Sequence, residues 1–118
     1  MSRNTPNLII TIEATGRRIR IGLDVLKILG MPPYVCLYQT EKRDSIAIGP
    51  CDGKNVMSFQ VPEKILRGEK CDYKINSKPF VSMIVEANKL EAGKPYRLNG
   101  VYREGRNLVT FSVGQVTP

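Results

Sequence analysis

Apolar and polar residues alternate in several short segments of the chain, which is typical of β-strands that bury one face. Residues 8–14 and 17–21 each place an apolar side chain at every second position. The Thr15-Gly16 pair between them is a turn signal. The pattern therefore predicts an N-terminal β-hairpin, with arginines on the polar face of its second strand.

Other stretches follow the spacing of an amphipathic helix. Residues 23–29 form the first predicted helix, and Gly30 is its C-terminal stop. A longer helix is predicted from Pro79 to Leu90, with Ser77 as the N-cap. A shorter helical turn is expected after Pro62.

The remaining apolar segments are short and are bounded by turn-forming residues, as strands are. They predict strands at residues 34–38, 45–48, 57–61, 73–75, 96–102 and 108–113. The chain has 118 residues, which is the size of one domain. We therefore expect a single α+β domain over residues 1–118, built as a small β-rich barrel or sandwich.

The order of these elements occurs twice along the chain. Residues 30–34 and 93–96 both contain glycine, proline and tyrosine, follow a predicted helix and open a hairpin. We interpret this as two strand-strand-helix-hairpin units, residues 7–53 and residues 54–114, followed by a tail at residues 115–118. The alternative is coincidence, because glycine and proline commonly end helices.

The strands of the two predicted units also correspond. Residues 19–21 match residues 73–75, and residues 46–48 match residues 109–111. Tyr34 and Tyr96 hold matching positions after each helix, which favours packing in the core over stacking on nucleic-acid bases.

The first unit carries a further pattern. Residues 16–21 read Gly-Arg-Arg-Ile-Arg-Ile, the predicted helix ends in Leu29-Gly30, and residues 46–50 read Ile-Ala-Ile-Gly-Pro. This order resembles the swapped-hairpin AbrB/MazE/MraZ family of transition-state regulators, antitoxins and cell-division regulators. The matching positions are Gly16, Arg17, Ile19, Ile21, Leu29, Gly30, Ile46, Ile48 and Pro50. The resemblance implies an AbrB-like swapped-hairpin fold, in which the arginines of the first hairpin approach DNA.

The chain is basic, with 18 lysines and arginines against 11 aspartates and glutamates and a net charge of +7. This balance is typical of proteins that bind nucleic acid, although charge also keeps small proteins soluble. The chain has no histidine, which excludes His-dependent catalysis and His-based zinc sites. Because paired-carboxylate and phosphate-loop motifs are also missing, we expect no enzyme activity, no cofactor and no metal.

The three cysteines, Cys36, Cys51 and Cys71, form no Cys-x-x-Cys pair, and an odd number argues against a closed disulfide framework. Cys36 lies in an apolar run and is predicted to be a core thiol. The N-terminal segment has no apolar stretch long enough for a signal peptide or a membrane span. We therefore expect a cytoplasmic protein without a membrane partner.

Six arginines are the candidate nucleic-acid-binding residues, because guanidinium groups on rigid hairpins suit phosphate or guanine. They are Arg17, Arg18 and Arg20 on the first predicted hairpin, and Arg97, Arg103 and Arg106 on the last. The alternative is that they only solvate the outer face of a strand. The basic segment at residues 64–78, which includes Lys74, is diluted by acidic residues and is expected to be a solvated linker.

These observations predict a small cytosolic DNA-binding protein that acts as a transcriptional regulator or antitoxin-type module. A homodimer is expected if the DNA site is symmetric. A second hypothesis is a phage or mobile-element protein that binds and inhibits a host protein, as anti-CRISPR inhibitors do. In that case Arg97, Tyr102, Arg103 and the helix at residues 79–90 would form a protein interface.

Overall fold

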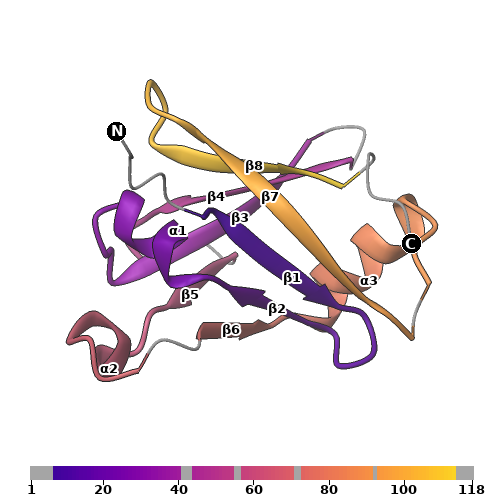
Figure 1. The fold of residues 1–118 in the computed structure, drawn as a ribbon, viewed down its shortest axis with the longest axis horizontal. Coiled ribbons are helices and arrows are strands. Elements are labelled where there is room, and N and C mark those ends of the chain that lie inside the picture. Colours follow the sequence, from indigo (N-terminus) through magenta and orange to yellow (C-terminus); the bar gives the residue numbers. More distant parts are fainter. Residues whose placement is uncertain (1–6, 41–43, 55–56, 71–72, 92, 114–118) are drawn as a thin grey trace, which may run out of the picture.

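The computed structural model describes residues 7–40, 44–54, 57–70, 73–91 and 93–113. These residues form a mostly antiparallel β structure with three helices (Figure 1). The strands are β1 (Ile9–Glu13), β2 (Arg18–Ile21), β3 (Tyr34–Gln39), β4 (Ser45–Pro50), β5 (Ser58–Gln60), β6 (Tyr73–Asn76), β7 (Pro95–Arg103) and β8 (Leu108–Ser112). The helices are α1 (Leu23–Ile28), α2 (Glu63–Leu66) and α3 (Lys78–Ala87). The predicted tail at residues 115–118 lies outside the described residues.

The strands form one antiparallel sheet in the order β5-β3-β4-β8-β7-β1-β2-β6. The sheet curls until its two edge strands approach each other, and the Tyr73 hydroxyl on β6 donates a hydrogen bond to the Gln60 carbonyl on β5 at 3.1 Å. The result is a small, compact, nearly closed barrel, as the predicted β-rich fold class allows.

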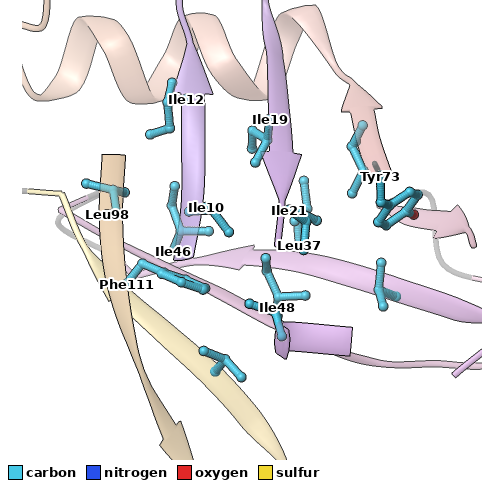
Figure 2. Packing of buried hydrophobic residues seen from close by; sticks show 14 of the residues in the cluster. Ile10, Ile12, Ile19, Ile21, Leu37, Ile46, Ile48, Tyr73, Leu98 and Phe111 are labelled. Atoms are coloured by element: carbon cyan, nitrogen blue, oxygen red, sulfur yellow. The ribbon is translucent and has the colours of Figure 1, made fainter. Parts of the chain in front are cut away.

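The alternation seen in the sequence fills this barrel. Side chains at every second strand position point inward and are almost completely buried (Figure 2). They include Ile10, Ile12, Ile19, Ile21, Leu37, Ile46, Ile48, Leu98 and Phe111. No polar or charged side chain among the described residues is buried. Burial of apolar surface is therefore the main source of stability, at about 25 cal/mol per Å².

The helices lie outside the sheet, with α1 and α3 on opposite sides of the molecule (Figure 1). Two backbone N–H groups just after each of these helices donate hydrogen bonds to carbonyl groups in its last turn. The donors are Gly30 and Met31 for α1 and Lys89 and Leu90 for α3. Gly30 has a φ of 88° and Lys89 a φ of 55°, the left-handed conformation that this ending requires. No helix in the described ranges is long and apolar enough to cross a membrane.

The two halves of the chain occupy equivalent places in the barrel. If β1, β2, β3 and β4 are exchanged with β5, β6, β7 and β8, respectively, each strand keeps the same neighbours around the barrel, with the edge strands β5 and β6 taken as neighbours. The tight β1–β2 hairpin then corresponds to the open position between β5 and β6, where α2 is inserted. The first strand of each half pairs with a strand of the other half: β1 pairs with β7, and β5 pairs with β3.

Ser77 is the N-cap residue of α3, as predicted, although its side chain makes no capping hydrogen bond. Two other sequence-based details are wrong. The helix α3 ends at Ala87 and not at Leu90, because Lys89 turns into the left-handed conformation. Tyr34 and Tyr96 do not share a core position: Tyr96 is buried, whereas Tyr34 is half-buried on the other face of its strand. The match of Tyr34 with Tyr96, which are 62 positions apart, is wrong by one position, and a shift of one residue moves a side chain to the opposite face of a strand.

Candidate nucleic-acid interface

A row of polar side chains crosses the outer face of four neighbouring strands. Arg20 on β2 lies opposite Lys74 on β6 and Thr11 on β1, and Thr11 lies opposite Arg97 on β7. The flanking residues on each strand are buried, so these four point away from the core. We call Lys74, Arg20, Thr11 and Arg97 the basic row. Adjacent strands are about 4.8 Å apart, so the row spans about 14 Å.

A shallow hollow of about 550 Å³ lies against this row, and both Arg20 and Arg97 line it. Thr11 also contributes to the lining. The acidic residue in the lining of this hollow is Asp24, whose carboxylate accepts a hydrogen bond from the Asn7 backbone N–H at 3.0 Å. Two guanidinium groups therefore face one open surface, where both can donate to an anion.

Glu13 forms ion pairs with Arg20 of the basic row and with Arg18 beside it. Its carboxylate oxygens lie 2.7 Å from Arg18 Nε and 3.3 Å from Arg20 Nη2. The arginine side chains remain 40% and 50% exposed, so solvent screens both ion pairs and each is worth about 1 kcal/mol or less. Glu13 thus holds two guanidinium groups on one face, and it also cancels one of the positive charges there.

Arg17 lies in the turn of the same hairpin, one residue before β2. It is half-buried and has a φ of 55°, a left-handed conformation that allows the chain to reverse between β1 and β2. The structure therefore brings Arg17, Arg18, Arg20 and Arg97 to one part of the barrel.

Arg103 and Arg106 lie elsewhere. They flank the turn between β7 and β8, which is at the opposite end of the molecule from the β1–β2 turn (Figure 1). Arg103 Nε donates a hydrogen bond to Thr110 Oγ1 at 3.1 Å. Arg97 and Arg103 are six positions apart, which is about 20 Å along an extended strand. The six candidate arginines thus form two separate groups.

The sequence reasoning missed Lys74, which it assigned to a solvated linker. Lys74 instead lies on β6, directly beside Arg20. The signal was present, because the comparison of residues 19–21 with residues 73–75 already matched Arg20 with Lys74. What the comparison did not provide was the direct pairing of these two strands.

The Cys36 thiol is enclosed by the core. Cys36 is completely buried, as predicted, and burial raises the pKa of its thiol to about 11, with a smaller contribution from the neighbouring Cys51 thiol. A thiol with such a pKa is a poor nucleophile at neutral pH. Cys71 lies outside the described residues. Within the described ranges, no group of three or more cysteine, aspartate or glutamate residues is arranged to hold a metal ion.

Comparison with protein-family models gives no match for this chain, and no curated protein or solved structure matches it significantly.

Proposed function

We propose that the protein binds DNA through the basic row, as a small transcriptional regulator or antitoxin-type module. The observation that supports this most strongly is the alignment of Lys74, Arg20 and Arg97 at neighbouring register positions on one outer face. A row of about 14 Å matches the axial length of about four phosphates, since one DNA strand carries a phosphate every 3.4 Å.

Duplex DNA fits this face better than single strands do. Recognition of single strands relies on aromatic side chains that stack on bases. The tyrosines closest in sequence to the row, Tyr73 and Tyr96, are both only 3% exposed and point into the barrel. The row therefore offers charge and hydrogen-bond donors but no stacking platform, which suits contacts with the phosphate backbone.

We further propose that the two halves of the chain are duplicated units of the swapped-hairpin type, as the resemblance to the AbrB/MazE/MraZ family implies. In support, each half contributes its first strand to the hairpin of the other half. On this proposal one chain completes the barrel by itself. A homodimer then serves only to read two DNA half-sites.

The test is the fluorescence anisotropy of a labelled duplex titrated at low salt. The double variant Arg20→Ala/Arg97→Ala is compared with Arg103→Ala/Arg106→Ala, which removes the same charge from the opposite end of β7. We expect the first variant to weaken binding by about 30- to 100-fold, because each lost phosphate contact costs about 1 kcal/mol or more.

The control variant should change the affinity by about threefold or less, the effect of distant charge alone. Equal losses in the two variants would show that only net charge matters, and the basic row would not be the binding site. A single strand of the same sequence that binds more tightly than the duplex would exclude the duplex proposal.

A further inference from the structure

The outer face of the barrel across β3, β4, β8 and β7 differs from the basic row. Tyr38, Ala47, Thr110 and Val101 occupy neighbouring register positions on these four strands. Tyr38 is 41% exposed and Val101 is 52% exposed, and they are the large apolar residues that the described part of the chain exposes most. We call this group the apolar row. Exposed apolar residues that share one face mark interaction surfaces.

Two hollows adjoin the apolar row. One, of about 440 Å³, lies between Tyr38 and Leu108, and the other, of about 460 Å³, lies between Leu108 and Arg103. Both are lined by Arg106, Leu108 and Thr110, so they meet along β8. Leu108 is held in place between them, because its side chain packs directly over Gly49 on β4, where a methyl group would collide with it.

The charged residues that line these hollows are basic, although Asp44 lies close by and its carboxylate accepts a hydrogen bond from Thr40, which is part of the lining. Arg103 and Arg106 line them, and no aspartate or glutamate among the described residues does. Glu104 belongs to the same turn but lines neither hollow. The surface therefore combines an apolar floor, an exposed tyrosine and a cationic rim, and tyrosine and arginine are the residue types enriched at protein interfaces.

This charge pattern identifies the kind of partner. A second copy of the chain, docked face to face, would bring arginine against arginine, which is unfavourable. Duplex DNA would satisfy the arginines but would leave Tyr38 and Val101 largely without apolar contacts. A protein segment that carries carboxylates around an apolar side chain matches both features of the surface.

We propose that this face binds an acidic segment of another protein. An apolar side chain of the partner enters the hollow between Tyr38 and Leu108, and its carboxylates pair with Arg103 and Arg106. Binding at this face is independent of the basic row, which lies on other strands except for the shared β7.

The probe is a short peptide blocked at both ends, with leucine and phenylalanine flanked on each side by two glutamates. It is titrated into the ¹⁵N-labelled protein and followed by NMR. We expect saturable shifts of the Tyr38, Thr110 and Arg106 amides, with a dissociation constant of about 0.1–1 mM, as is reasonable for a small unoptimised ligand. The matched peptide with lysines in place of the glutamates should leave these amides unchanged.

Two variants test the assignment. Arg106→Glu should weaken binding of the acidic peptide at least about tenfold, because it reverses a charge on the rim. Arg20→Glu makes the same change on the basic row and should bind the peptide as the natural protein does. The spectra of both variants also report that the barrel is folded.

Several outcomes would overturn the proposal. They are equal binding of the lysine peptide, no shift with about 5 mM acidic peptide, well above the expected dissociation constant, and shifts confined to other faces. Concentration-dependent shifts at the apolar row without any peptide would show that a second copy occupies it. Shifts of the same amides with duplex DNA would assign the face to nucleic acid.

Discussion

Gly100 lies in the middle of β7, where it is paired with Phe111 on β8. A Cβ atom at this position would lie 2.5 Å from Phe111 Cε2 and 2.7 Å from Val109 Cγ1. Both of these side chains are completely buried, so neither can move aside without disturbing the core. The ring of Phe111 thus occupies the space that any other residue at position 100 would need. Gly100→Ala should therefore destabilise the protein by about 1–3 kcal/mol, the usual cost of overpacking a core.

Urea unfolding followed by circular dichroism measures this effect. A loss of about 2 kcal/mol with a slope of about 2 kcal/mol per molar urea lowers the midpoint by about 1 M. Gly105→Ala is the matched control, because a Cβ there meets no atom within 4 Å. We expect the control to leave the midpoint unchanged or to raise it slightly, since alanine restricts the unfolded chain. A Gly100→Ala protein that unfolds at the same urea concentration as the natural protein would refute this account of the packing.

Three further predictions follow from single contacts. Glu13→Gln releases Arg18 and Arg20 from their shared carboxylate and should tighten duplex binding about three- to tenfold, as anisotropy would show, while costing about 1 kcal/mol of stability or less. The raised pKa of Cys36 shows that the folded state favours the neutral thiol. The contribution of this neutral thiol to the free energy of unfolding is complete below pH 9.0 and is lost as the pH rises toward about 11. The free energy of unfolding of Cys36→Ala should therefore fall less steeply over that pH range. Lys89→Gly should raise the unfolding free energy by about 0.5–1 kcal/mol, because glycine adopts the observed φ of 55° without strain, and an unchanged midpoint would contradict this.

Local patterns predicted the elements of this fold well. The alternation of apolar residues on β1 and β2 and the helical spacing of α1 are set by neighbours in sequence, and Gly30 ends α1 as expected. The burial of Cys36 followed from its apolar neighbours. Such features depend on periodicity and turn chemistry, which a single sequence displays.

The pairing of distant strands was not predictable in the same way. In the sequence Lys74 belongs to a basic segment that is diluted by acidic residues, and only the contact between β2 and β6 makes it part of the basic row. The same long-range pairing separates Arg97 from Arg103, because β7 is nine residues long and the two arginines lie toward its opposite ends. Which residues share a face could be predicted along each strand, but which strands adjoin depends on the whole core.

The salt dependence of duplex binding tests the central proposal most directly. The logarithm of the association constant, plotted against the logarithm of the salt concentration, has a slope of about −0.9 for each phosphate that the protein neutralises. The three cations of the basic row therefore predict a slope of about −2.7, or about 40-fold weaker binding between about 50 and 200 mM salt. Loss of Arg20 and Arg97 should bring the slope close to −1. No duplex binding at low salt, or a slope that these substitutions leave unchanged, would contradict DNA binding through this face.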